Sequence, residues 1–138
     1  MIDDTDPFTG TWNFNARRSS LDTPLPRTWI QAIVATPDEL VVRETIVRAD
    51  GSATQVRVWA RFDGGDYPVN GLPFVDFIAY QRAGRNRISG VGKKNGIMVL
   101  NETVTVDEAG KVLILIYSIQ NGISSIATGM AVFDKSPA

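Results

Sequence analysis

Apolar and polar residues alternate along much of the chain with the two-residue period of a β-strand. In the first such stretch, one side carries Phe8, Gly10, Trp12, Phe14 and Ala16, and polar residues occupy the positions between them. A second stretch repeats the pattern with Val56, Val58, Ala60 and Phe62. A strand of this kind packs one face on a core and leaves the other in water. We therefore expect Trp12 to point inward.

Nine stretches of this kind predict nine strands, over residues 8–16, 29–36, 40–48, 54–63, 74–82, 87–94, 97–107, 112–120 and 124–134. Turn dipeptides such as Asp50-Gly51 and Asn95-Gly96 separate them and favour tight hairpins. Only residues 19–25 could form a helical turn, which Pro24 and Pro26 would end. The pattern thus predicts a single all-β domain over residues 1–138. Its strands either pack as two sheets or close into an antiparallel up-and-down barrel, and closure removes the exposed edges.

The composition narrows the chemistry that this domain could perform. The chain has no histidine and no cysteine. Catalysis by Ser-His-Asp or Cys-His groups is therefore excluded, as are histidine-ligated haem and the common zinc sites. Carboxylates, tyrosine, lysine and arginine remain for any acid–base work. We expect no cofactor and no metal.

Charge and hydropathy limit the partners and the location of the chain. The net charge of −1 lacks the basic excess of a nucleic-acid binder. No apolar run approaches the roughly 20 residues that span a bilayer, and the acidic start of the chain lacks a signal-peptide core. We expect no nucleic acid and no membrane span. The chain as given reads as soluble and cytoplasmic, or as periplasmic or secreted if a signal peptide was removed.

Five side chains are candidates for a site inside the domain. Strand alternation places Glu44, Asp76 and Glu102 each on a mainly apolar face. An isolated ionised carboxylate there is costly, so it should pair or take up a proton. The alternative is that a carboxylate near a strand end simply reaches water. Tyr80 and Tyr117 also face the core, where a buried hydroxyl needs a partner from the protein or from a ligand.

Two loops and one strand suggest contacts at the surface. The proline-bearing segments 19–28 and 66–73 either lie across an open barrel end or simply pack as long connections. The stretch Val112 to Ile119 is apolar on both faces. A barrel strand should be wet outside, so this stretch predicts a covered outer face or a homodimer.

The segment Gly10-Thr11-Trp12 resembles the Gly-x-Trp signature that opens lipocalins and related calycin barrels. More closely, residues 10–19, 62–71, 78–82 and 131–135 are similar to small bacterial lipocalin-like proteins of unassigned function. Lys135 stands near the position where lipocalins carry a closing Arg over the Trp. The resemblance implies a calycin barrel and leaves the function open.

Three functions follow as hypotheses. The leading one is binding of a small, mainly hydrophobic molecule in the barrel interior, with Trp12, Glu44, Asp76, Tyr80, Glu102 and Tyr117 as ligand-binding candidates. The second is an isomerase- or cyclase-type enzyme that uses a buried carboxylate. The third is a packed barrel that serves as a structural or interaction module. The sequence favours binding over catalysis and names no catalytic residue.

Overall fold

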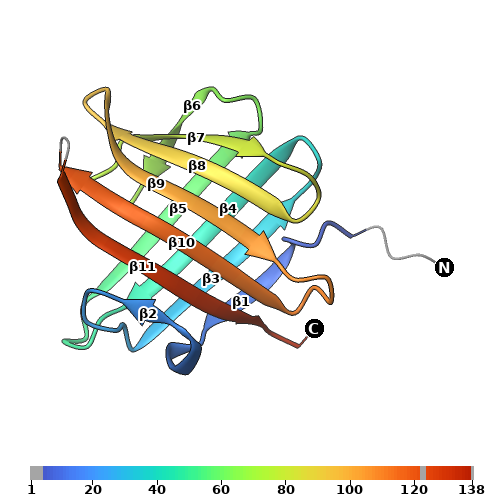
Figure 1. The fold of residues 1–138 in the computed structure, drawn as a ribbon, viewed down its shortest axis with the longest axis horizontal. Helices are drawn as coiled ribbons and strands as arrows, with labels where there is room; N and C mark the ends of the chain where they lie inside the picture. The colour runs from blue at the N-terminus through green and yellow to red at the C-terminus, as the bar shows by residue number, and fades with distance from the viewer. Residues whose placement is uncertain (1–4, 122–123, 138) are drawn as a thin grey trace.

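The alternation along each strand gives one antiparallel sheet whose apolar face turns inward, and this sheet closes into a barrel (Figure 1). The computed structural model describes residues 5–121 and 124–137. Within them, a barrel of 10 strands forms because the first strand pairs with both the second barrel strand and the last one. The prediction of an all-β up-and-down barrel is confirmed.

The barrel follows chain order, with one short strand outside it. Its elements are β1 (Gly10–Phe14), the 3-10 helix η1 (Ala16–Arg18), β2 (Ser20–Leu21), β3 (Thr28–Ala35), β4 (Glu39–Val47), β5 (Ala53–Arg61), β6 (Asp66–Asn70), β7 (Phe77–Arg82), β8 (Arg87–Lys94), β9 (Ile97–Val106), β10 (Val112–Asn121) and β11 (Ser124–Lys135).

Two strands were not predicted. β6 lies in the segment read as a proline-bearing loop, and its Tyr67 and Val69 are half-buried while the residues between them are exposed. It pairs with β5 and β7 through only a few residues. β2 has two residues and lies on the outside, against β11. The helical turn is also displaced, to residues 16–18 from the expected 19–25.

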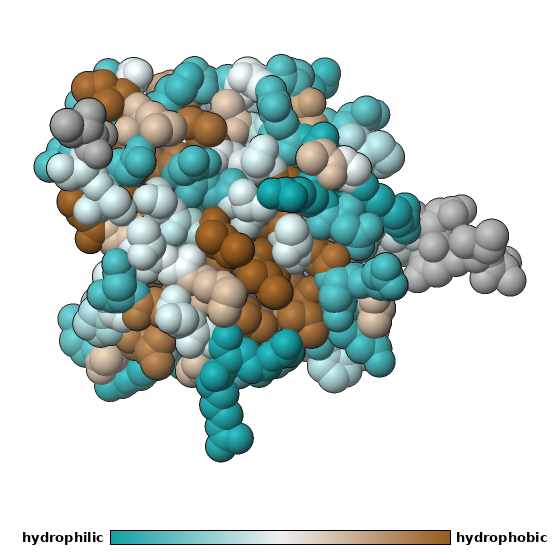
Figure 2. All heavy atoms as spheres, viewed as in Figure 1, coloured by the Kyte–Doolittle hydropathy of each residue, from teal (hydrophilic) through white to brown (hydrophobic). Residues whose placement is uncertain are grey.

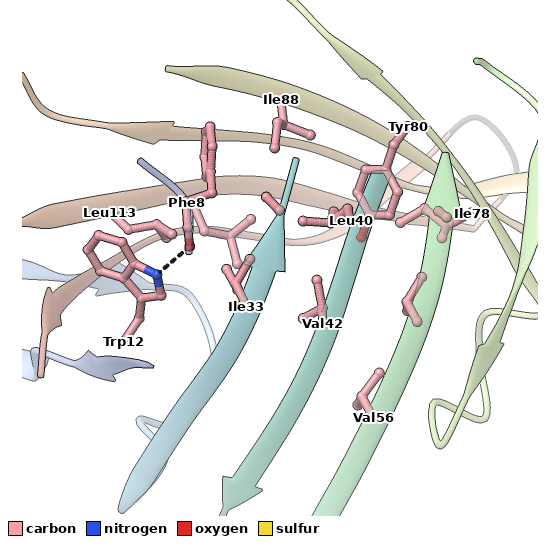
Figure 3. Packing of buried hydrophobic residues seen from close by; sticks show 14 of the residues in the cluster. Phe8, Trp12, Ile33, Leu40, Val42, Val56, Ile78, Tyr80, Ile88 and Leu113 are labelled. Carbon is pink, nitrogen blue, oxygen red and sulfur yellow. Dashed lines mark hydrogen bonds between the residues drawn. The ribbon is translucent and has the colours of Figure 1, made fainter. Parts of the chain in front are cut away.

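One end of the barrel, on the right of Figure 1, is closed by the segment that leads into β1. Phe8 of this segment is fully buried, and the Trp12 Nε1–H donates a 3.0 Å hydrogen bond to its carbonyl oxygen (Figure 3). The Lys135 Nζ lies 5.5 Å from the centre of the Trp12 ring. The prediction that Trp12 points inward is confirmed.

Arg82 seals the same end. Its guanidinium forms an ion pair with Asp6 at 2.6 Å and lies over the rings of Phe8 and Phe62. Three backbone carbonyls also accept from it, those of Thr36, Gly84 and Arg85. Every polar group of this buried cation is therefore satisfied.

The opposite end carries the connections between β2 and β3 and between β6 and β7. Val75 of the second connection is buried, and Leu72 packs against the core. On the barrel wall, the rings of Phe14, Trp29 and Phe133 cluster with centroids 5.0 to 5.8 Å apart; Phe133 meets the other two edge-to-face, and the planes of Phe14 and Trp29 are tilted by 33°. Both proline-bearing segments thus contribute to the same end.

The outer surface of β10 and β11 is unusually apolar for a barrel. Ile116 is 55% exposed and pairs across the strands with the exposed Met130, and Ile114 lies two residues before Ile116 on the same face of β10. Figure 2 shows hydrophobic side chains gathered on this side of the barrel. We call these three residues the β10–β11 apolar face.

Among the described residues, no helix is long and apolar enough to cross a membrane.

Candidate functional site

Two carboxylates, a tyrosine and a glutamine meet in the middle of the barrel. Strand register explains how they are brought together from four strands. Tyr80 on β7, Gly90 on β8 and Glu102 on β9 lie directly opposite one another in consecutive strand pairs. All three point inward because they share the parity of the buried residues of their strands. Figure 3 shows the Tyr80 ring reaching into the interior from β7.

Gly90 is what allows Tyr80 to reach Glu102. A Cβ at position 90 would lie 2.9 Å from the Tyr80 ring and 3.1 Å from the Cγ of Glu102. The two side chains therefore occupy the space above a strand that has no side chain there. Across this gap the Tyr80 hydroxyl donates a hydrogen bond to the Glu102 carboxylate.

Glu44 comes from the other side of the barrel. It lies opposite Gln31 in the pairing of β3 with β4, and both side chains point inward. The Trp29 Nε1–H donates a 2.9 Å hydrogen bond to the Glu44 Oε1. Trp29 is two residues from Gln31 on the same face of β3, so one strand supplies both polar neighbours of the carboxylate.

These groups line a hollow of about 40 Å³. Its polar lining is Gln31, Glu44, Tyr80 and Glu102, and its apolar lining is Phe8, Ile33, Leu40, Val42, Ile88, Val104 and Leu115. Glu44 and Glu102 keep intermediate accessibility although they face inward, because the hollow lies against them. A water molecule needs roughly 10–15 Å³ of such space, so the hollow of about 40 Å³ accommodates a group the size of about three waters.

Burial without a counter-charge sets the electrostatics of the site. Burial first, and then the charge of Glu44, raise the pKa of Glu102 to about 7, against the opposing effect of the Tyr80 hydrogen bond. The pKa of Glu44 is raised by burial against the opposing effect of the Trp29 hydrogen bond. Burial first, and then both carboxylates, hold the pKa of Tyr80 well above its usual value. Near neutral pH the pair therefore holds a proton that it readily exchanges.

No lysine or arginine lines the hollow. Among the described residues, the basic side chains that are not exposed are Arg82, Lys93, Lys94 and Lys135. Arg82 is committed to Asp6, the two neighbouring lysines to rim carboxylates, and Lys135 to the Trp12 ring. The same part of the chain contains no group of three acidic side chains placed to hold a metal ion.

Three of the six predicted site residues meet at the hollow, namely Glu44, Tyr80 and Glu102. Trp12 is fully buried toward the closed end and lies outside the lining. Tyr117 faces inward as expected, but it lies over Gly129 and bonds to Thr23, away from the hollow.

The expectation that Asp76 faces the apolar interior is wrong. β7 begins one residue later, and Asp76 lies at the rim, where its carboxylate accepts from the Lys94 Nζ at 3.0 Å and from the Asn95 backbone N–H. These bonds hold the pKa of Asp76 below its usual range, the backbone bond contributing most. Asp76 therefore follows the alternative stated for these residues, in which a carboxylate near a strand end reaches water.

Gln31, Trp29 and Gly90 were not predicted as parts of the site. The signal for Gln31 was available, because it is the polar residue within the alternating series Trp29, Gln31, Ile33 and Ala35. Because Gln31 is neutral, the cost of burying an ionised group did not mark it as a candidate. Gly90 could be recognised only from the register of β7, β8 and β9, which places Tyr80 on one side of it and Glu102 on the other.

Comparisons of the chain with protein-family models and with curated proteins found no match.

Proposed function

We propose that this barrel binds a small, mainly hydrophobic molecule in its interior and orients it through Glu44, Glu102, Tyr80 and Gln31. The observation that carries the proposal is the hollow itself, an apolar space with its few polar groups gathered at one place. Ligand sites commonly combine these two features, since the apolar lining supplies affinity and the polar groups supply orientation.

The volume of the hollow limits the size of the ligand group that can enter before side chains move. About 40 Å³ holds a polar head group, and an apolar tail requires neighbouring side chains to move. The half-buried side chains of Trp29 and Ile119 are best placed to do so, because they lie between the carboxylates and the end of the barrel opposite Phe8. We infer that the ligand enters from that end.

Kinship with the lipocalin-like barrels remains part of the proposal. Besides the Gly-x-Trp segment, it is supported by the cation over the indole, since Lys135 lies above the Trp12 ring as the resemblance implies for a closing Arg. This kinship bears on the fold and adds nothing about the ligand.

The direct test is native mass spectrometry of the protein purified from its own source. A retained small molecule, released on unfolding, supports the proposal. A second test uses Nile red, a neutral dye whose emission rises in an apolar site. We expect Val42→Trp, which fills the hollow, to abolish a signal that Ile116→Ser on the outer surface leaves unchanged. Dye binding that survives Val42→Trp would contradict an interior site.

A second function, acid–base catalysis of an isomerase or cyclase type, is favoured by one observation. The Glu102 carboxyl has a pKa of about 7 and faces the hollow, so it exchanges a proton near neutral pH as a general acid or base must. Turnover of an isolated ligand that disappears in Glu102→Gln while binding persists would favour this function over binding alone.

A further inference from the structure

The charges of the interior do not balance. Glu44 is close enough to raise the cost of ionising Glu102, and no basic side chain of the described residues lines the hollow beside them. Each buried carboxylate in an apolar surrounding costs several kcal/mol unless it is paired or protonated. A cation brought by a ligand is the group that would relieve this cost.

Gln31 provides a second, independent observation. Gln31 is buried, with 6% of its surface exposed, and it lines the hollow. Within the described part of the chain its carboxamide makes no hydrogen bond, and its polar atoms are open to the hollow that it lines. Its partner is therefore expected to occupy the hollow.

The hydrogen-bond acceptors that remain free at the hollow indicate which kind of donor group would fit there. The Glu44 Oε1 accepts from Trp29 and one oxygen of Glu102 accepts from Tyr80. The second oxygen of each carboxylate and the carbonyl oxygen of Gln31 remain. A primary ammonium group carries three N–H donors and one positive charge, and it is about as large as a water molecule.

We propose that the interior site takes the ammonium group of a small primary amine, with Glu44, Glu102 and Gln31 as its acceptors. This inference rests on the proposed function and names the class of ligand. An alcohol of the same length would satisfy fewer acceptors and leave the charge uncompensated, whereas a carboxylate would be repelled by the pair.

The test compares three four-carbon probes, namely n-butylamine, butan-1-ol and butanoate, at pH 8. At this pH the amine is cationic and Glu102 is mostly ionised, since its pKa is about 7. Binding is followed by NMR through the Trp29 indole N–H, which reports on Glu44 directly. The exposed indole of Trp59 is the internal control, because it lies on the outer face of β5.

We expect n-butylamine to bind about tenfold or more tightly than butan-1-ol, and butanoate not to bind, since hydrogen bonds to charged groups exceed neutral ones by about this factor. Glu44→Gln and Glu102→Gln should each remove most of the preference for the amine, and Gln31→Leu should weaken amine binding several-fold. Glu108→Gln removes an exposed carboxylate and should change nothing.

Equal binding of the amine and the alcohol would overturn the amine inference while leaving interior binding in place. An amine preference that persists in both Glu→Gln variants would overturn it as well, because the charge would then come from elsewhere. Failure of all three probes together with Nile red would instead remove the proposed function.

Discussion

Arg82 and the Glu44–Glu102 pair are both charged groups withdrawn from bulk water, but they differ in the partners that the barrel supplies to them. Arg82 meets a carboxylate at 2.6 Å, three backbone carbonyls and two aromatic rings. The two glutamates meet an indole N–H, a tyrosine hydroxyl and each other. The first arrangement is complete within the chain and the second is not. We infer that the Arg82 charge stabilises the fold, whereas the charges of Glu44 and Glu102 are placed to bind a ligand.

Removing the guanidinium should have the largest effect on stability. Arg82→Leu leaves Asp6 buried without its counter-charge, so we expect the free energy of unfolding to fall by about 3–5 kcal/mol in urea titrations. Asp66→Asn is the matched control, because it breaks the exposed 3.2 Å ion pair with Lys93 and should cost under about 1 kcal/mol. Equal losses in the two variants would show that the closed end does not depend on Arg82.

The carboxylate pair should make stability fall as the pH rises. Below about pH 4.5 Glu102 is protonated in both the folded and the unfolded state; between 4.5 and its folded pKa of about 7, only the unfolded state ionises. The unfolding free energy should therefore decrease over this interval by up to about 3 kcal/mol, less whatever solvent reaching the hollow screens. The raised pKa of Glu44 acts in the same direction.

Glu102→Gln tests this origin of the pH profile. We expect the variant to be more stable than the wild type at pH 8 and to lose most of the decline between pH 5 and 7, measured by urea unfolding. Glu108→Gln should keep the full decline, since that side chain is exposed. Clear destabilisation by Glu102→Gln at pH 8 would mean that Glu102 anchors a structural hydrogen bond.

The lowered pKa values of Asp63 and Asp76 act only at lower pH, where protonating them costs stability.

Gly90→Ala should have a smaller effect on stability and a specific effect on titration. The added methyl group would press on the Tyr80 ring at 2.9 Å, which costs about 1–3 kcal/mol when a packed site is overfilled. It should also separate Tyr80 from Glu102 and remove the hydrogen bond that lowers the Glu102 pKa. Carbon-13 NMR titration of the carboxyl should then show an upward shift. An unchanged pKa would refute the role given to Gly90.

The smallest effect on the folded monomer is expected at the β10–β11 apolar face. If this face joins two copies, Ile116→Lys should abolish association in sedimentation equilibrium while changing monomer stability by less than about 0.5 kcal/mol, as is usual for an exposed position. Thr103→Lys, on the neighbouring outer position of β9, tests whether any added charge has the same effect. A wild type that stays monomeric at several hundred micromolar would remove the homodimer.

The sequence predicted the parts of the molecule that depend on alternation alone. Glu44, Tyr80 and Glu102 face inward because each lies mid-strand, where parity is reliable. Asp76 failed because its strand begins one residue after it. β6 was read as a loop because Pro68 lies in its middle, and only its position between β5 and β7 identifies it as a strand. That Tyr80 meets Glu102 required the register across three strands, which no single strand contains.

The pairing of β1 with β11 that closes the barrel also constrains how the chain folds. Trp12 lies opposite Lys135, so this contact joins residues about 120 positions apart, whereas the other neighbouring barrel strands follow one another along the chain, with only η1 and the outer strand β2 intervening between β1 and β3. Closing so long a loop is entropically costly and is favoured only after the intervening hairpins have formed. During synthesis on the ribosome, the first strand must therefore wait with one edge unpaired until almost the whole chain has emerged.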